Sequence, residues 1–173
     1  MRLSLRCCLP TVSQRTGRFP LDEPAELTTN QVGPTDRFDW LRTAPELRAR
    51  QTALLLGTAT TDPLLRDFDL GKWGGSLIMD IHAGEAASWR REPEWAGHGG
   101  ESVAELCHRV GAWLDAYHEP GHTIAVTHGP VIRAAVLHVL GAGPEGFWNL
   151  DVEPLGTADL RWTGQAWRLR SLG

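Results

Sequence analysis

Lysine is almost absent from this chain of 173 residues: Lys72 is the only lysine among 17 basic side chains, and the others are arginine. The formal net charge is −4, and no run of basic residues occurs. Because proteins that bind nucleic acids present clustered positive charge, we expect no nucleic-acid partner. Arginine binds phosphate through two parallel N–H donors, which lysine cannot do, so the bias is compatible with a phosphate site.

Cysteine is also scarce. The three cysteines are Cys7, Cys8 and Cys107, and two of them are adjacent, a pattern that does not form a disulfide framework. No segment approaches the roughly 18–20 apolar residues that a membrane span needs. The first residues show no charged-then-apolar signal pattern. The sequence therefore predicts a cytoplasmic protein without a membrane partner.

Apolar patterning gives a coarse map of the elements. Strands are predicted at 2–8, 37–43 and 122–127, a loop at 11–37, and helices at 46–56, 76–81, 103–117 and 130–140. Ser102 and Glu105 form a capping box before the third helix, with Val103, Leu106, Val110, Trp113 and Leu114 on one face. Gly141 ends the fourth helix, and segments 158–162 and 166–170 alternate like a terminal hairpin.

Strands that alternate with helices predict one domain over residues 1–173, with a three-layer α/β/α architecture and a mostly parallel sheet. Ligands of such sheets bind beyond the carboxyl ends of the strands. Cys8 and His128 both fall at such ends. We therefore expect the functional site to include these two residues.

Five segments then occur in a specific order: MRLSLRCCLPT, TAPELRARQTALLLG, DFDLGKWGG, GHGGES and VTHGPVIRAAV. Each is weak alone, but in this order they resemble the motifs of the histidine phosphatase (phosphoglycerate mutase-like) superfamily. The resemblance extends over nearly the whole chain. It implies that family's fold and a phosphohydrolase-like site for a small phosphorylated or anionic molecule, with no cofactor.

The first segment departs from the family at the nucleophile. Family members carry an Arg-His-Gly-x-Thr type corner, and an ungapped match places Cys7 on the arginine, Cys8 on the histidine and Thr11 on the threonine. An alternative register places Cys7 on the histidine, but Thr11 and Arg18 then lose their matches. A thiol is shorter than an imidazole, so its sulfur would fall about 2 Å short of the attack position, where a misplacement of about 1 Å can cost roughly a hundredfold.

The remaining motifs preserve the family pattern, and the resemblance implies their roles. Asp67 is the acidic proton donor, with Asp69 as a near rival, and His128 donates to the phosphoryl oxygens. The implied substrate-binding residues are Thr11, Arg18, Arg48, Glu101, Ser102 and Gly129. A dianionic phosphoryl group requires such converging arginine and histidine donors, and its leaving oxygen requires an acid.

Three functions remain open. The first is a divergent enzyme with catalytic residues Cys8, Asp67 and His128 and weak or no ordinary phosphatase activity. The second is a non-catalytic anion-binding relative in which Cys8 is inert. The third is a thiolate–metal site formed by Cys7, Cys8 and His128, although residues 7 and 8 would point to opposite faces of a regular strand.

If Cys8 is a reactive thiolate, neighbouring arginines should lower its pKa and make it the fastest-alkylating thiol. The sequence does not indicate an oligomeric state, a specific substrate, or whether the cysteine replaces a histidine naturally or by introduction.

Overall fold

A computed structural model describes residues 1–26 and 37–173. Its six strands form one sheet in the order β3-β2-β4-β1-β5-β6. The strands are β1 (Arg2–Cys7), β2 (Trp40–Thr43), β3 (Thr60–Thr61), β4 (His122–Thr127), β5 (Thr157–Trp162) and β6 (Trp167–Leu172). The first four run parallel to one another, whereas β5 runs antiparallel to both of its neighbours, β1 and β6. This confirms the predicted α/β architecture with a mostly parallel sheet and a terminal hairpin.

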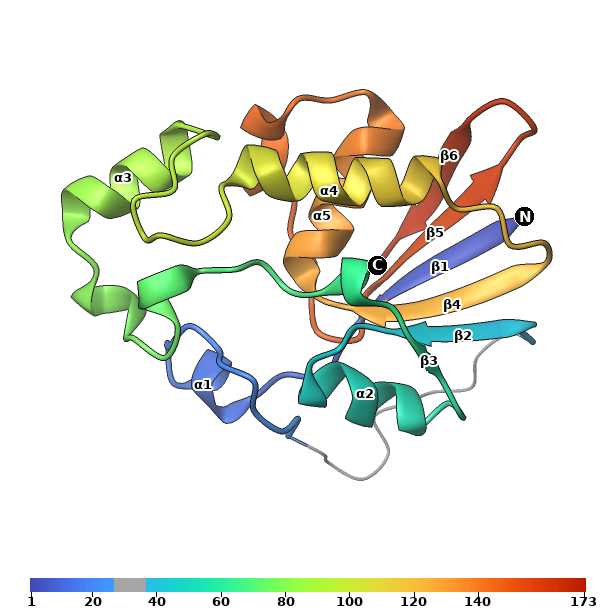
Figure 1. The fold of residues 1–173 in the computed structure, drawn as a ribbon, viewed down its shortest axis with the longest axis horizontal. Helices are drawn as coiled ribbons and strands as arrows, with labels where there is room; N and C mark the ends of the chain where they lie inside the picture. The colour runs from blue at the N-terminus through green and yellow to red at the C-terminus, as the bar shows by residue number, and fades with distance from the viewer. Residues whose placement is uncertain (27–36) are drawn as a thin grey trace.

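Helices cover both faces of the sheet (Figure 1). They are α1 (Val12–Arg15), α2 (Leu47–Leu54), α3 (Ala83–Arg91), α4 (Val103–Asp115) and α5 (Gly129–Leu140), with short 3-10 helices η1 (Pro63–Leu65), η2 (Gly71–Trp73), η3 (Ile78–Asp80) and η4 (Pro144–Asn149). Helix α2 packs on β2 and β4, while α5 packs on β1 and β6 with α4 beside it. The result is the three-layer arrangement that the alternating pattern predicts.

Local sequence signals fix the ends of the long helices. The Ser102 hydroxyl accepts from the backbone N–H of Glu105 at 3.1 Å, and the Glu105 carboxylate accepts from the Ser102 N–H at 2.7 Å, which completes the predicted capping box. Helix α5 ends where Gly141 takes a left-handed conformation (φ 64°), which glycine adopts without steric cost. The apolar face predicted for α4 is buried.

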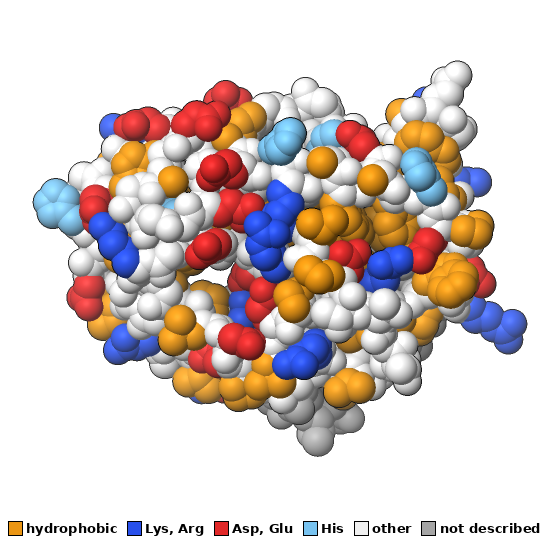
Figure 2. All heavy atoms as spheres, viewed as in Figure 1, with side chains coloured by type: hydrophobic (Ala, Val, Ile, Leu, Met, Phe, Trp, Pro, Cys, Tyr) orange, Lys and Arg blue, Asp and Glu red, His pale blue; other side chains and the backbone are white. Residues whose placement is uncertain are grey.

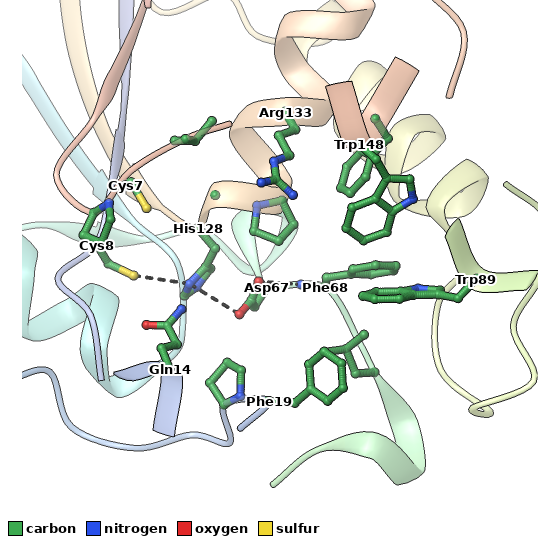
Figure 3. Close-up of a pocket in the computed structure, with 17 residues that line it drawn as sticks. Cys7, Cys8, Gln14, Phe19, Asp67, Phe68, Trp89, His128, Arg133 and Trp148 are labelled. Carbon is green, nitrogen blue, oxygen red and sulfur yellow. Dashed lines mark hydrogen bonds and ion pairs between the residues drawn. The ribbon is translucent and has the colours of Figure 1, made fainter. Parts of the chain in front are cut away.

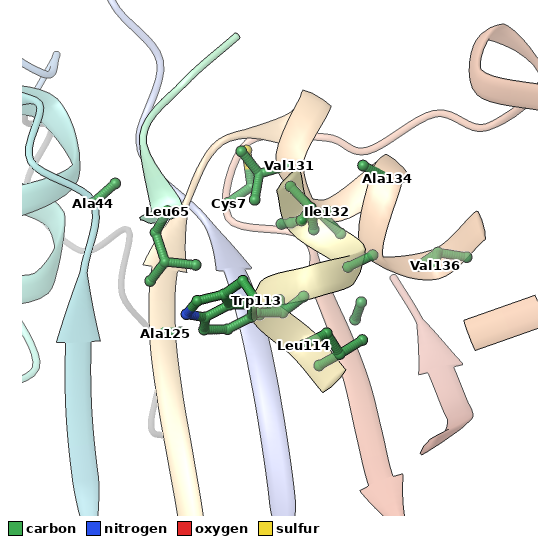
Figure 4. Close-up of a cluster of buried hydrophobic side chains, with 14 of the residues drawn as sticks. Cys7, Ala44, Leu65, Trp113, Leu114, Ala125, Val131, Ile132, Ala134 and Val136 are labelled. Carbon is green, nitrogen blue, oxygen red and sulfur yellow. The ribbon is translucent and has the colours of Figure 1, made fainter. Parts of the chain in front are cut away.

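The main core lies between the sheet and the α4–α5 layer (Figure 4). Figure 4 draws Trp113 and Leu114 of α4 and Val131 and Ile132 of α5 above the sheet, where Ala125 of β4 is also buried. Because this core fixes α5 against the sheet, it also fixes the residue at the amino terminus of α5, which is His128.

Several element predictions need correction. The strand predicted at 37–43 begins only at Trp40, and the helix predicted at 76–81 is only the 3-10 turn Ile78–Asp80. The loop predicted at 11–37 contains α1, which Thr11 caps, and its residues 27–36 lie outside the described residues. Helix α3 has no counterpart in the prediction, because its residues 83–91 show little apolar periodicity.

Candidate active site

Strands β1 and β4 are parallel neighbours, and both end at the same edge of the sheet. Cys7 pairs with Thr127, so the next residues, Cys8 and His128, emerge side by side. The Cys8 N–H donates to the Thr127 carbonyl at 2.8 Å, and the Cys8 Sγ lies 3.4 Å from His128 Nδ1. The predicted juxtaposition of Cys8 and His128 is therefore present, and Figure 3 shows it at one end of a cavity of about 270 Å³.

The cavity contains both adjacent cysteines. Cys7 and Cys8 line it together, because the chain has already turned out of the strand at Cys8. A hydrogen bond from the Leu9 N–H to the Thr52 hydroxyl, 3.0 Å long, holds this turned segment against α2. Residues 7 and 8 would point to opposite faces only if the regular strand continued through Cys8, and the strand ends at Cys7.

His128 is held by two acids. It is the N-cap residue of α5, and its Nε2 lies 2.7 Å from the carboxylate of Glu46, while its Nδ1 lies 3.6 Å from Asp67. Burial alone would lower the pKa of His128, but the charge of Asp67 and hydrogen bonds to Cys8 and Glu46 outweigh it and raise the pKa to about 10. The ring is therefore a cation at neutral pH, which suits an anion site.

Glu46 shows the complementary change. Burial alone would raise its pKa, but the hydrogen bond and charge of His128 and the N–H of Asp67 lower it to about 2. That N–H donates to Glu46 Oε1 at 3.0 Å. A carboxylate on α2 therefore links the histidine after β4 to the segment that contains Asp67.

Arg48 and Asp67 form a buried ion pair beside these groups. Arg48 donates through Nη2 to the Asp67 carboxylate and through Nη1 to the Leu21 carbonyl at 2.8 Å. Asp67 lines both the cavity of Cys8 and a neighbouring hollow lined by Arg48. Its carboxylate thus lies between the two cationic groups, Arg48 and His128. Its rival Asp69 instead accepts from the Gly71 N–H at 2.9 Å and does not line the cavity of Cys8.

The two thiols differ in their acidity. The hydrogen bond with Cys7 and burial raise the pKa of Cys8 well above its ordinary value, whereas the hydrogen bond from Cys8 lowers the pKa of Cys7. The pKa of Cys8 is therefore not lowered by arginine, contrary to expectation. The hydrogen bond with Cys7 and burial outweigh the opposing effect of His128, which lowers the pKa of Cys8.

Of the six predicted substrate-binding residues, Gly129 lines the cavity, Arg48 lines the neighbouring hollow, and four others line neither. Thr11 caps α1, and Ser102 caps α4. Arg18 is exposed and donates to the Gly75 carbonyl at 3.0 Å. The buried Glu101 carboxylate accepts from Arg109 at 2.8 Å. In this conformation these four residues stabilise the loops around the site.

Several lining residues were missed by the sequence reading. Gln14 belongs to α1, and Arg133 lies on α5 five positions after His128, in the same motif. The motif itself could have drawn attention to Arg133, but helical spacing could not, because residues on one helix face are three or four positions apart. The aromatic residues Phe19, Phe68, Trp89, Phe147 and Trp148 also line the cavity. They come from four separate segments of the chain, so no local sequence pattern predicts that they share a cavity.

The proposed metal site lacks the ligands it would need. Across residues 1–26 and 37–173, no group of three or more His, Cys, Asp or Glu side chains is arranged to hold a metal ion. The alternative of a Cys7–Cys8–His128 metal centre is therefore not supported.

No described helix combines the length and apolarity required to cross a membrane. On the face shown in Figure 2, acidic and basic side chains are interspersed rather than separated.

Comparison with known proteins decides the family. The sequence profile of the histidine phosphatase superfamily (branch 1) matches residues 24–173. The chain belongs to the histidine phosphatase superfamily. This match begins after Cys7 and Cys8, so it rests on the motifs that contain Arg48, Asp67 and His128.

Curated relatives within the histidine phosphatase superfamily include phosphatases. A glucosyl-3-phosphoglycerate phosphatase of Mycolicibacterium vanbaalenii is 28% identical, with 69% of each chain covered. The protein of that name from Mycobacterium tuberculosis is 35% identical over 106 residues, which are 50% of this chain and 48% of the relative.

Solved structures confirm the histidine phosphatase fold. An Entamoeba histolytica phosphoserine phosphatase, a mutant in complex with phosphoserine, superposes with a TM-score of 0.83 over 99% of this chain and 95% of that chain, at 17% identity. A mycobacterial glucosyl-3-phosphoglycerate phosphatase with bound VO3 gives 0.80 at 23% identity, covering 97% and 96%. At these identities the likeness concerns the fold.

Proposed function

We propose that this protein binds small phosphorylated metabolites in the cavity of Cys8 and His128 and hydrolyses them only slowly. The observation that carries the proposal is the convergence of a cationic His128, the buried Arg48 and the acid Asp67 at the ends of β1 and β4. The names of the curated relatives, which are phosphatases of phosphorylated metabolites, support the same class of ligand.

Each group has a role in binding a phosphomonoester. Arg48 and His128 provide charge-assisted donors for the phosphoryl oxygens. In the structure the Asp67 carboxylate occupies the space between them, so an incoming phosphate must displace it from Arg48. Once displaced, Asp67 is placed to give a proton to the leaving oxygen.

Slow turnover follows from Cys8. Its sulfur is a protonated, buried thiol, because its pKa is raised, and a thiol is a weak nucleophile compared with a thiolate. Its side chain is also shorter than the imidazole that the family uses. Both properties favour binding over chemistry, and they also favour the second candidate, an anion-binding relative without turnover.

Asp67→Asn tests the proposal, because it separates binding from chemistry. Loss of the negative charge should tighten the binding of inorganic phosphate about tenfold, since one like charge is removed from the site. The same change should reduce any turnover of p-nitrophenyl phosphate by roughly a hundredfold, because the acid is lost. Titration calorimetry and product release measure the two quantities.

Asp69→Asn is the matched control. Asp69 accepts a hydrogen bond inside its own loop, so this variant should bind phosphate and turn over substrate as the unmodified protein does. Phosphate binding with no turnover in the unmodified protein would favour the non-catalytic candidate. Absence of phosphate binding in both the unmodified protein and Asp67→Asn would contradict the proposal.

A further inference from the structure

The cavity has two ends of different chemistry (Figure 3). Cys8, His128 and Asp67 form the polar end. The opposite end is formed mainly by aromatic rings, of which Phe68, Trp89 and Trp148 are labelled in the view. A phosphoryl group bound at the polar end would therefore direct the organic part of its molecule toward the rings.

The rings form a fixed wall rather than a loose collection. Phe68 and Trp89 are nearly parallel, with ring centroids 6.2 Å apart and an interplanar angle of 20°. Trp148 packs edge-on against Trp89 at 4.5 Å and against Phe147 at 5.0 Å. Because each ring contacts another one in a favourable geometry, the wall keeps its shape when the cavity is empty.

Polar groups are few at this end. Among the described residues that line the cavity there, Arg133 provides the charged side chain, and Figure 3 shows its guanidinium directed between His128 and Trp148. That guanidinium lies 5.6 Å from the Phe147 ring centre and 5.8 Å from that of Trp148. It therefore adds a cationic edge to the aromatic wall.

The wall suits some ligands and opposes others. A group rich in hydroxyls would leave its hydrogen bonds with water and find few partners among these side chains, which is costly. A flat apolar ring would instead bury its surface against Trp89 and Trp148 and lose no hydrogen bonds. The volume of about 270 Å³ is at the lower limit for ligand pockets and admits a small molecule.

We propose that the molecule bound here is a phosphomonoester whose organic part is a flat aromatic group packed against Trp89 and Trp148. This inference rests on the proposed function, because it needs the phosphoryl group at the polar end. It specifies the class of substrate, an aromatic phosphomonoester. A site of this kind would prefer such a ligand to sugar phosphates or amino-acid phosphates.

Three ligands that share a phosphoryl group and differ in the rest of the molecule test the inference. Titration calorimetry is run with 1-naphthyl phosphate, phosphoserine and inorganic phosphate. We expect 1-naphthyl phosphate to bind about tenfold tighter than phosphoserine, the size of a favourable stacking contact. In Trp148→Leu, which keeps apolar volume but removes the ring, the ratio of 1-naphthyl phosphate to inorganic phosphate affinity should fall about tenfold.

Trp40→Leu is the matched control, because Trp40 is an exposed tryptophan of β2 that does not line the cavity. In this variant the ratio of 1-naphthyl phosphate to inorganic phosphate affinity should equal that of the unmodified protein. Phosphoserine that binds as tightly as 1-naphthyl phosphate, or a ratio that survives in Trp148→Leu, would overturn the inference and leave the proposed function standing. If none of the three ligands binds, the proposed function fails, and the inference fails with it.

Discussion

The segments that follow β1 and β4 lie side by side, yet they are built differently. After β4, His128 leads directly into the 12-residue helix α5, and both ring nitrogens have partners. After β1, the chain passes through Cys8, Leu9 and Pro10 before the four-residue helix α1. The β4 corner is thus held by a long helix and an acid, whereas the β1 corner is a loop held by hydrogen bonds to Thr127 and Thr52.

This contrast bears on the two parts of the proposed site, anion binding and chemistry. Binding of an anion depends on groups that the long elements α2 and α5 fix, namely Arg48 and His128. The proposed nucleophile, Cys8, depends on the loop after β1, where its pKa is raised. Binding is therefore expected to be better preserved than chemistry.

The largest effect is expected from Arg48→Ala. Removal of the guanidinium leaves the partly buried Asp67 without its partner, so the free energy of unfolding should fall by about 3 kcal/mol. The variant should also lose the stabilisation by phosphate, which is about 2.7 kcal/mol at 100 times the dissociation constant. Urea unfolding with and without phosphate measures both.

Arg50→Ala removes an exposed arginine from the same helix and should retain the phosphate effect. If Arg48→Ala does not fold, Arg48→Lys keeps a charge and should weaken phosphate stabilisation, since a lysine cannot make the same paired donors. If phosphate stabilises either Arg48 variant as much as it stabilises the unmodified protein, the anion binds elsewhere.

Cys8→His sharpens the comparison at the β1 corner. The longer ring should reach toward the substrate and raise p-nitrophenyl phosphate turnover by about tenfold, a partial recovery because Cys7, Leu9 and Pro10 also differ from the family corner. Cys8→Ser, which stays short, is the control and should show no gain. No gain in a folded Cys8→His protein that binds phosphate would mean that the loop itself has lost the geometry.

The thiols should alkylate in an order set by their environments. Cys7 should react several-fold faster than Cys8, because the pKa of Cys7 is lowered and that of Cys8 is raised. Burial raises the pKa of Cys107 to about 11, so it should also react slowly. Mass-resolved iodoacetamide labelling at pH 8 gives the order. Faster labelling of Cys8 would show that the thiolate resides on Cys8.

The pH dependence of stability tests the charges of His128 and Glu46. The pKa of His128 is raised to about 10, so its stabilising contribution is complete below about 6.5 and is lost as the pH rises through 10. Glu46, with a pKa lowered to about 2, contributes above about 4.5 and loses this as the pH falls through 2. The pair thus contributes most between about pH 4.5 and 6.5.

His128→Gln should therefore differ most in unfolding free energy from the unmodified protein within that window, and the difference should shrink toward pH 10. Urea unfolding across pH measures it. His138→Gln, which removes a partly exposed histidine bonded to Asp115 on the surface, should change the profile much less. A difference for His128→Gln that stays constant from pH 6 to 10 would contradict the charged state of His128.

The sequence alone predicts the parallel strands, the caps of α4 and α5, and the placement of Cys8 and His128 at strand ends. These follow from periodicity and capping, which depend on residues a few positions apart. It also pointed to Asp67 and Arg48, through motifs whose spacing is local. The motif of Glu101 and Ser102 also predicts that they line the site, and in the structure their side chains bond to Arg109 and to the backbone of α4.

The residues that surround these side chains are known only from the tertiary structure. Glu46 meets His128 across 82 positions of sequence, and the aromatic wall assembles from α3, η4 and two loops. The surroundings of Cys8 likewise depend on a distant segment, because the Thr127 carbonyl and the His128 ring, at the end of β4, are its hydrogen-bond partners. Contacts of this kind depend on strand order and helix packing, which bring distant segments together and leave no periodic trace in the chain.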